Sequence, residues 1–314
     1  SSDLGAIIGS GWAGLDESYL AVPEFEKTGV SSPFSCFFSM PNVSTAACSQ
    51  LWNLRGYQNT PVAACATGTI AVGEAYDAIR FGRASMLLAG AGESLNSVCA
   101  IWNIDVLGAL SRETESPERA SCPFSLQRSG FVLSEGGAVL CLEERESALA
   151  RGATILAEVT GYANFSDAVD FTSPAEDCVA REQTIRWALR GADLQPADLD
   201  YINAHGTSTP LNDLNETQSL KKALGDEAYR IPISSTKAYS GHLIAAAGSF
   251  ETIVCLQAMA AGILPATAHL TQPDPQCDLD YIAEGHRQGE IHRALNLSFG
   301  FGGANAALVL EKHA

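Results

Sequence analysis

Short runs of β-branched and aliphatic residues alternate along this chain with longer stretches in which apolar residues recur at helical spacing. This alternation is typical of strand–helix–strand units, and it predicts an α/β fold with largely parallel sheets. The predicted strands are Gly5–Gly9, Ser85–Ala91, Gly137–Leu142, Ile155–Tyr162, Leu199–Ala204, Ile231–Ser235, Leu295–Ser298 and Ala306–Leu310. The predicted helices are Cys65–Phe81, Val179–Arg190, Asp213–Leu224 and Leu243–Ala261.

The alternation restarts near residue 151. A charged, helix-like stretch, Glu143–Arg151, ends there and a new strand follows. We therefore divide the chain into an N-terminal half, residues 1–150, and a C-terminal half, residues 151–314. A chain of 314 residues can bury one large core or two fused half-domains without disulfides.

Charge and cysteine content exclude several classes of protein. The 19 Lys and Arg are outnumbered by 36 Asp and Glu, and this net charge of −17 argues against nucleic-acid binding, because phosphate contacts need clustered cations. Nine cysteines without a CxxC pair indicate neither a disulfide framework nor a metal site. No apolar run reaches the ~18 residues of a membrane span, and the opening residues lack the basic flank of a signal peptide. These features predict a cytoplasmic protein that contacts no membrane.

One cysteine, Cys65, stands where an extended segment gives way to a helix, in Ala-Cys-Ala-Thr-Gly. A thiol at a helix N-terminus meets the positive end of the helix dipole and unpaired N–H groups, which lower its pKa and can hold an oxyanion. The small residues around it let a substrate approach closely. We interpret Cys65 as a nucleophile. The alternative is a buried structural cysteine, which is the commoner role of a free cysteine.

Two histidines follow predicted strands in the C-terminal half. His205 lies in Asn-Ala-His-Gly-Thr-Ser-Thr, and His242 lies in Ser-Gly-His-Leu. Side chains at the C-terminal ends of parallel strands line the sites of α/β proteins, so both imidazoles are candidates for catalysis. Thr207 and Thr209 offer hydroxyls to a substrate. The alternative makes Thr209 or Asp213 a helix N-cap and His205 a structural histidine.

Two further features complete the candidate site. A partly buried Lys237 needs a carboxylate, and Glu251 on the next predicted helix is its candidate partner; the alternative leaves both solvated. Three glycines flank Phe301 in Ser-Phe-Gly-Phe-Gly-Gly-Ala-Asn-Ala, which indicates a backbone turn that can lie close to a ligand. The spacings of phosphate-binding loops, GxGxxG and GxxxxGK[ST], are not met there.

Together these four motifs resemble those of the β-ketoacyl-acyl-carrier-protein synthases of the thiolase superfamily, most closely the elongating type II branch and its polyketide relatives. The resemblance covers essentially the whole chain, and the motifs occur in family order. It implies a thiolase fold, in which two related halves form a five-layer αβαβα sandwich, normally as a dimer. It also implies an acyltransferase that performs decarboxylative Claisen condensation of an acyl thioester with malonyl-acyl carrier protein, in fatty-acid or polyketide synthesis.

The resemblance assigns roles by motif. Cys65 would carry the acyl group, and His205 and His242 would stabilise the enolate formed from the malonyl thioester. The N–H groups of Cys65 and Phe301 would form an oxyanion hole, and Phe301 would gate the acyl chamber. Substrates arrive on the phosphopantetheine arm of acyl carrier protein, and no metal or other cofactor is implied. The remaining assignments are substrate contacts by Thr207, Thr209, Phe131, Trp12 and Asn305, ordering of the site by Lys237, and structural support by Glu251 and Asp213.

Three departures from the family pattern carry expectations of their own. Family members have a block of sequence before the equivalent of Leu4–Gly11, and we expect it to be missing here, with one sheet edge uncovered. Trp12 stands where relatives line the deep end of the acyl pocket with smaller aliphatic residues, which predicts a preference for short or unusually shaped chains. Gly108 stands where relatives place a docking arginine, so carrier-protein binding is expected to rely on other segments, a partner subunit or weak contacts.

Two other functions occur on this fold. A non-condensing partner subunit of the chain-length-factor kind replaces the nucleophile, whereas Cys65 is present with both histidines. A thiolase uses a second cysteine near the Gly-rich end, and no cysteine lies beyond Cys277. A cysteine hydrolase, on another fold, would give His242 no role. The expected partners are acyl carrier protein and either a second copy of the chain or a related synthase or chain-length-factor subunit.

Overall fold

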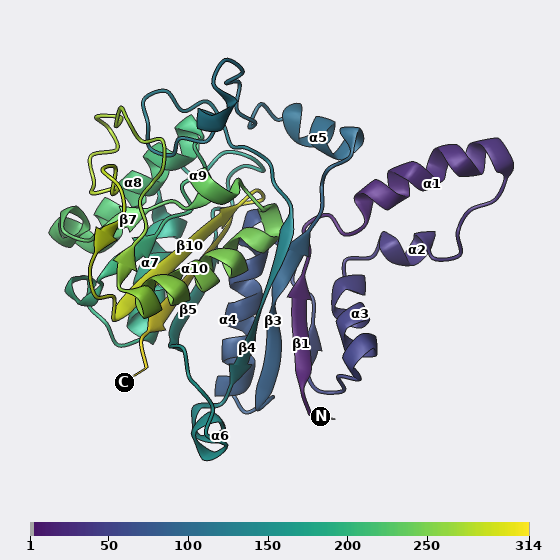
Figure 1. Ribbon diagram of the computed structural model, residues 1–314, viewed down its shortest axis with the longest axis horizontal. Helices are drawn as coiled ribbons and strands as arrows, with labels where there is room; N and C mark the ends of the chain where they lie inside the picture. Colours follow the sequence, from purple (N-terminus) through teal and green to yellow (C-terminus); the bar gives the residue numbers. More distant parts are fainter. Residues whose placement is uncertain (1–2, 314) are drawn as a thin grey trace.

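Two β-sheets form the framework of the computed structural model, which describes residues 3–313 (Figure 1). The first sheet has the order β2-β1-β3-β4, and its strands are Gln58–Asn59, Gly5–Gly9, Met86–Glu93 and Gly136–Glu143. The second has the order β5-β11-β10-β6-β7, and its strands are Glu158–Ser166, Ala304–Glu311, Arg293–Gly300, Tyr201–Asn203 and Ile233–Ser234. A small two-stranded sheet joins β8 (Ile263–Leu264) to β9 (Arg287–Gln288). Each large sheet therefore draws its strands from one side of residue 150, although the domain boundary itself stays a prediction.

Helices cover and separate the two sheets, giving five layers (Figure 1). α3 (Val43–Trp52) packs against β1 on the outer face of the first sheet. α4 (Thr67–Arg80) and α10 (Ala247–Ala261) lie between the sheets, and each contacts strands of both. α7 (Val179–Gly191) packs on β5 and β11 from the far side, with α8 (Pro210–Leu224) beside it. This is the αβαβα order that the sequence analysis predicts.

The sheets are mixed rather than largely parallel. β1 pairs in parallel with β2 and β3, and β6 pairs in parallel with β7 and β10. One edge of each sheet is antiparallel, with β4 on β3 in the first sheet, and β11 on β10 with β5 beyond it in the second. The prediction of largely parallel sheets is wrong at these edges. The turn between β10 and β11 spans only residues 301–303, far too few for the crossover that a parallel pair needs.

The sequence analysis missed three of the longer helices of the N-terminal half: α1 (Leu15–Thr28), α3 and α5 (Val98–Asp105). α1 buries no residue and contains Pro23, which interrupts the helical sequence pattern. Figure 1 shows that α1 and the short α2 (Ser35–Phe38) stand away from the body of the protein. We refer to α1 and α2 together as the arm.

α10 and the turn before it form a long apolar segment, Ile244–Ala261. By length and composition this segment could cross a membrane, so the expectation that the chain has no such run is wrong. However, 61% of it is buried inside the protein, where it packs between the two sheets. Its apolar character is that of a core helix covered on several sides.

The two central helices begin in the same way. A 3-10 turn precedes each one, η1 (Ala64–Ala66) before α4 and η5 (Ile244–Ala246) before α10. The first residues of these turns, Ala64 and Ile244, both have a left-handed backbone, with φ of 45° and 50°. The two halves therefore place matching turns at the centre of the molecule, and Cys65 in the first turn corresponds to Ala245 in the second.

β4 ends the first sheet, whereas β5 covers the corresponding strand, β11, of the second sheet. No strand within residues 3–313 pairs with the free edge of β4. A hollow of about 730 Å³ lies along this edge, lined by β4, residues 153–159 and part of α10.

Candidate active site

Cys65 occupies the turn η1 and is only 4% exposed. The Gly-rich loop after β10 lies directly against this turn, because a Cβ at Gly300 would stand 2.6 Å from the carbonyl oxygen of Ala63 and 3.3 Å from the nitrogen of Cys65. Glycine is needed for so close an approach. A loop from the C-terminal half is thus held on the candidate nucleophile of the N-terminal half.

Burial raises the pKa of the Cys65 thiol to about 11. The charge of Lys237 and hydrogen bonds from the backbone N–H groups of Phe301 and Cys65 act in the opposite direction, but they do not outweigh burial. The sequence-based expectation of a lowered pKa is therefore wrong, because desolvation of the thiolate exceeds what the helix N-terminus offers. The two N–H groups beside the sulfur are those of the predicted oxyanion hole.

His205 follows β6, and buried partners fix its backbone. Glu216 of α8 accepts hydrogen bonds from the N–H groups of His205, at 2.7 Å, and Gly206, at 2.8 Å. Lys237 Nζ donates to the carbonyl oxygen of His205 at 2.6 Å. The imidazole Nδ1 is buried and has no hydrogen-bond partner among the described residues. The backbone N–H and carbonyl of His205 are therefore both hydrogen-bonded within the protein, whereas its Nδ1 is available to bind a ligand.

The tautomer of His242 follows from its surroundings. Its Nδ1 accepts a hydrogen bond from the N–H of Ile244 at 3.2 Å, so the neutral ring carries its proton on Nε2. Nε2 is buried, and no group within residues 3–313 bonds to it. Phe131 packs edge-on against the ring, with 5.1 Å between the ring centroids. His242 therefore presents an N–H donor to the site.

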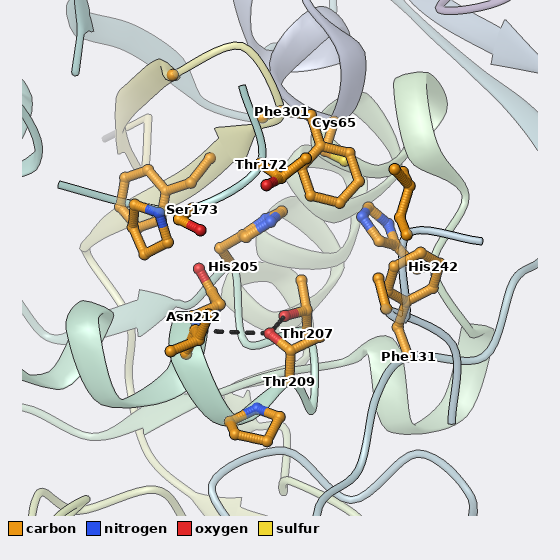
Figure 2. Close-up of a pocket in the computed structure, with 18 of the residues that line it drawn as sticks. Cys65, Phe131, Thr172, Ser173, His205, Thr207, Thr209, Asn212, His242 and Phe301 are labelled. Carbon is orange, nitrogen blue, oxygen red and sulfur yellow. Dashed lines mark hydrogen bonds between the residues drawn. The ribbon is translucent and has the colours of Figure 1, made fainter. Parts of the chain in front are cut away.

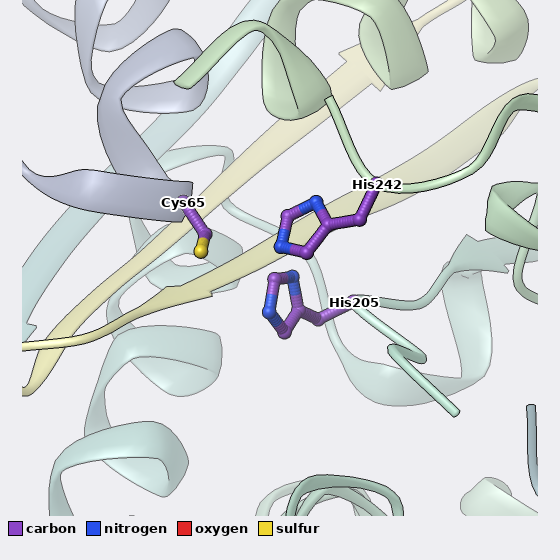
Figure 3. Close-up of side chains that lie close together, drawn as sticks. All are labelled: Cys65, His205 and His242. Atoms are coloured by element: carbon purple, nitrogen blue, oxygen red, sulfur yellow. The ribbon is translucent and has the colours of Figure 1, made fainter. Parts of the chain in front are cut away.

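The sulfur and the two imidazoles converge, as Figure 3 shows. One atom each from Cys65, His205 and His242 lies within 4.8 Å of the other two, and the two rings meet edge to face at 5.5 Å. Burial, followed by the charge of Lys237, holds the pKa of both histidines well below the usual value, so both rings are neutral near pH 7. The spacing alone would also admit a metal ion, and the absence of a metal stays a prediction.

Lys237 and Glu251 form a buried ion pair beside this cluster. Lys237 Nζ lies 2.5 Å from Glu251 Oε1, and each side chain is 1% exposed. Burial raises the pKa of Glu251 to about 7, although Lys237 opposes the rise. The ammonium of Lys237 also donates a hydrogen bond to the carbonyl oxygen of His205. The ion pair therefore connects α10 to the loop that contains this histidine.

A cavity of about 400 Å³ opens onto the three side chains (Figure 2). Four other residues singled out from the sequence line it: Phe131, Thr207, Thr209 and Phe301. The hydroxyls of Thr207 and Thr209 lie 2.8 Å apart, and Thr209 also caps α8 by accepting from the N–H of Asn212 at 3.3 Å. The N-cap and ligand-binding interpretations of Thr209 are therefore compatible.

Besides the buried Lys237 and Glu251, three predicted site residues do not line this cavity. Trp12 packs instead against the apolar cluster that includes Cys65. Asn305 donates from its amide to Asp167 Oδ1 at 2.9 Å and to the carbonyl oxygen of Gly303 at 3.0 Å, and these bonds hold the Gly-rich loop. Asp213 accepts from the N–H of Phe124 at 2.9 Å inside the core, a placement that agrees with structural support.

Sequence reasoning overlooked several buried polar residues of the site. Asn212 and Glu216 lie four residues apart on α8, and this helical spacing of polar side chains could have shown a buried polar face. The sequence around Arg181 gives no comparable indication of burial, because most arginines are exposed. The overlooked residues that line or support the site are Glu93, Arg181, Asn212 and Glu216.

Two stacked α/β halves, which bring a buried cysteine and two neutral histidines together, define an acyltransferase of the thiolase fold. Comparison with known families identifies which one. Residues 1–148 match the model of the β-ketoacyl synthase N-terminal domain, and residues 156–271 match that of the C-terminal domain. The chain belongs to the β-ketoacyl synthase family.

Individual relatives support this assignment. The chain is 39% identical to 3-oxoacyl-[acyl-carrier-protein] synthase 2 of Synechocystis sp., over 100% of this chain and 76% of the relative. It is 42% identical to a putative polyketide β-ketoacyl synthase 1 of Streptomyces halstedii, over 86% of this chain and 64% of the relative. A solved type II polyketide ketosynthase, in complex with its acyl-carrier protein, superposes with a TM-score of 0.95 at 35% identity, covering all of this chain and 79% of that one.

Proposed function

We propose that this chain catalyses decarboxylative Claisen condensation, joining an acyl group held on Cys65 to malonyl-acyl carrier protein and giving a β-ketoacyl-acyl carrier protein. The observation that carries the proposal is the convergence of one thiol and two neutral imidazoles within 4.8 Å. Membership of the β-ketoacyl synthase family supports it. The product would serve fatty-acid or polyketide synthesis.

In the first half-reaction the Cys65 sulfur attacks the carbonyl carbon of the acyl-carrier thioester. A bond forms to Cys65, the bond to the pantetheine sulfur breaks, and the thiol proton ends on the departing sulfur. The N–H groups of Cys65 and Phe301 stabilise the oxyanion of the tetrahedral intermediate. Because burial raises the pKa of the free thiol to about 11, Cys65 is almost entirely protonated near pH 7 before the acyl-carrier thioester binds.

In the second half-reaction the malonyl thioester loses CO₂. The electron pair of the broken carbon–carbon bond forms an enolate, whose oxygen accepts hydrogen bonds from His205 and His242. The enolate carbon attacks the acyl-Cys65 carbonyl, and collapse of the tetrahedral intermediate expels the Cys65 thiolate, which takes up one proton. Neutral imidazoles suit this step, because they donate hydrogen bonds without adding a positive charge that would have to be buried.

The remaining residues support these steps. Lys237 and Glu251 hold the His205 loop, and Thr207 and Thr209 offer hydroxyls along the route of the pantetheine arm. The chemistry proposed here uses no metal or other cofactor. A cytoplasmic location, expected from the sequence, remains part of the proposal.

Acyl carrier protein is the proposed partner that delivers both substrates. The cavity lining includes Leu107, Gly108 and Leu211, and the two leucines are 46% and 63% exposed. Among the described residues that line the cavity, the one cationic side chain is the buried Arg181. Docking through apolar contacts at this mouth would depend weakly on salt, in contrast to docking on an arginine patch.

A second copy of the chain, or a related synthase or chain-length-factor subunit, is the other proposed partner. The arm supports this proposal because it exposes several large apolar side chains on a segment that buries none of its own residues. Contiguous exposed apolar surface of this kind marks protein interfaces. One structural neighbour, at a TM-score of 0.90 and 29% identity, is a ketosynthase/chain length factor.

Intact-mass spectrometry tests the reaction directly. Incubation with acyl-carrier proteins of graded length should add the acyl mass to the wild-type protein and not to Cys65→Ala. His205→Ala and His242→Ala should still be acylated but should lose decarboxylation of malonyl-carrier by on the order of 100-fold or more. Acylation that persists in Cys65→Ala would refute the proposal.

The same experiment addresses chain length. Trp12 packs against the apolar cluster that contains Cys65, so its bulk limits space near the acylated sulfur. Short acyl groups should therefore load faster than long ones, and Trp12→Ala should reduce the difference. Equal loading of short and long chains by the wild type would contradict this preference.

A further inference from the structure

Arg181 is a buried cation in the wall of the active-site cavity. It lies on α7 and is 5% exposed. Its guanidinium stacks on the ring of Phe299 at 4.1 Å, and Phe299 meets His205 at 5.7 Å. The arginine therefore stands one aromatic ring away from a proposed catalytic imidazole.

The positive charge of Arg181 has no directly bonded counter-ion. Its Nη1 donates to Asn212 Oδ1 at 3.1 Å, and no carboxylate within residues 3–313 forms an ion pair with it. Its Nε is buried without a hydrogen-bond partner in the same part of the chain. Three carboxylates, those of Glu216, Asp167 and Asp213, act on the guanidinium only at a distance. Asn212 links it to the first of them by donating from Nδ2 to Glu216 Oε2 at 3.3 Å.

An unpaired buried arginine is costly, because a desolvated charge needs a partner. Lys237, the buried lysine of the same site, differs from Arg181 because it forms a direct ion pair with Glu251. Burial also lowers the pKa of Arg181, yet an arginine remains protonated in proteins. A charged, donor-rich side chain that lines a substrate cavity is suited to bind an anionic ligand.

We propose that Arg181 binds the free carboxylate of the extender thioester in the complex that precedes decarboxylation. The inference rests on the proposed function and deepens it, because it names the group that distinguishes the malonyl substrate from a simple acyl substrate. Asn212, which accepts a hydrogen bond from the guanidinium, lies on the His205 side of the cavity, and Phe131 and His242 lie on the other (Figure 2). A malonyl group whose thioester oxygen lies between the imidazoles can direct its carboxylate to the His205 side.

This role has a kinetic consequence. An ion pair to the carboxylate stabilises the bound substrate, and it disappears when the carboxylate leaves as CO₂. To the extent that it stabilises the bound substrate more than the transition state, its loss should raise KM for malonyl-carrier and leave kcat unchanged or higher. A structural role, in which Arg181 only holds Phe299 or Asn212, would instead lower kcat through misplacement of His205.

The test compares Arg181→Met and Arg181→Lys with the wild type in the full natural protein. Arg186→Met, on the exposed side of the same helix, is the matched loss of one positive charge. The readouts are KM and kcat for malonyl-carrier, and the rate at which an acyl-carrier without a free carboxylate loads Cys65. Circular dichroism verifies folding, and the lysine variant keeps the test valid if the methionine variant does not fold.

Arg181→Met should raise KM for malonyl-carrier on the order of 10- to 100-fold, the range expected for a charge-assisted hydrogen bond. Loading by the uncharged acyl-carrier should change less than about twofold, and Arg181→Lys should recover part of the loss. Equal weakening of both substrates would overturn the proposal and assign the arginine to the phosphate of the pantetheine arm. A fall in kcat at constant KM would assign it a structural role. Failure of the wild type to load Cys65 would count against the proposed function itself.

Discussion

At the scale of single residues, burial decides the charge state of the catalytic groups. Cys65, His205 and His242 all lie out of solvent, which favours the neutral thiol and the neutral imidazoles. Stabilisation of the oxyanion and of the enolate must then come from N–H donors that are already in place. Such donors act strongly in a site that excludes water.

The pKa of Cys65 predicts how the free thiol reacts with an alkylating agent. Because only the thiolate is nucleophilic, the iodoacetamide rate at Cys65 should rise about tenfold per pH unit and still be rising at pH 10, toward the pKa of about 11. Free cysteine, with a pKa of ~8.5, should level off earlier. Peptide-resolved mass spectrometry separates Cys65 from the other eight cysteines. A plateau below pH 9 would show that the N–H groups and Lys237 outweigh burial.

Glu251 predicts a pH dependence of stability. Burial raises its pKa from 4.5 to about 7, so the folded protein holds this proton more tightly than the unfolded chain does. The associated stability is present below about pH 4.5 and is lost as the pH rises through 7. Relative to Glu251→Gln, which cannot titrate, the wild-type free energy of unfolding should fall by up to about 3 kcal/mol between pH 4.5 and 8. Urea denaturation at several pH values measures the difference, and parallel curves would contradict the assignment.

At the scale of elements, the close contact of α4 and α10 positions the nucleophile. A Cβ on Gly68 would stand 2.6 Å from the nitrogen of Ser249 and 2.8 Å from the carbonyl oxygen of Ala245. The small residues at the starts of both helices therefore allow the two turns, η1 and η5, to meet at the centre of the molecule. Any bulk added here separates the helices.

Gly68→Ala should consequently cost about 1–3 kcal/mol of stability through overpacking. It should also slow acylation of Cys65, which lies three residues earlier. Gly191→Ala on α7 is the matched control, because its Cβ would meet Gly161 Cα at an ordinary 3.7 Å. The free energy of unfolding of this control should stay within about 1 kcal/mol of the wild-type value, because alanine is more favourable than glycine in a helix. Thermal unfolding and intact-mass loading measure both effects, and a neutral Gly68→Ala would argue against tight packing.

The elements that could be predicted from the sequence are those with a buried face. β1 runs from Gly5 to Gly9 as predicted, and α7 and α8 differ from prediction only at their ends. α1 was missed because Pro23 lies inside it and a proline is unfavourable in the interior of a helix. The antiparallel edges were missed because strand direction depends on connections and not on strand composition.

The features of the candidate site likewise include some that the sequence indicated and some that only the structure showed. Cys65, His205 and His242 stand in distinctive motifs, and the sequence was sufficient to single them out. The pKa of Cys65 was predicted in the wrong direction, because local sequence shows a helix start but not how deeply it is buried. Arg181 was missed because only the fold places it beside Phe299.

At the scale of the whole molecule, the two halves contribute unequally to the surface. The arm of the N-terminal half exposes large apolar side chains, among them Leu20 at 66% and Phe25 at 55%, and the next helix, α3, adds Leu51 at 72%. A soluble protein rarely leaves so much apolar surface in contact with water. A face of this kind is expected to be covered by a partner subunit.

The arm therefore predicts the oligomeric state. If a second copy covers it, the wild type should sediment at twice the monomer mass at micromolar concentration. The double variant Leu20→Asp with Phe25→Asp should sediment as a monomer, because burying two carboxylates in an apolar interface costs several kcal/mol. Phe81→Asp changes a side chain that is equally exposed, at 66%, but lies outside the arm, and it should leave the dimer intact. A monomeric wild type that pairs only when a related subunit is co-expressed would replace the homodimer with a heterodimer, and a dimer that survives the double variant would place the interface elsewhere.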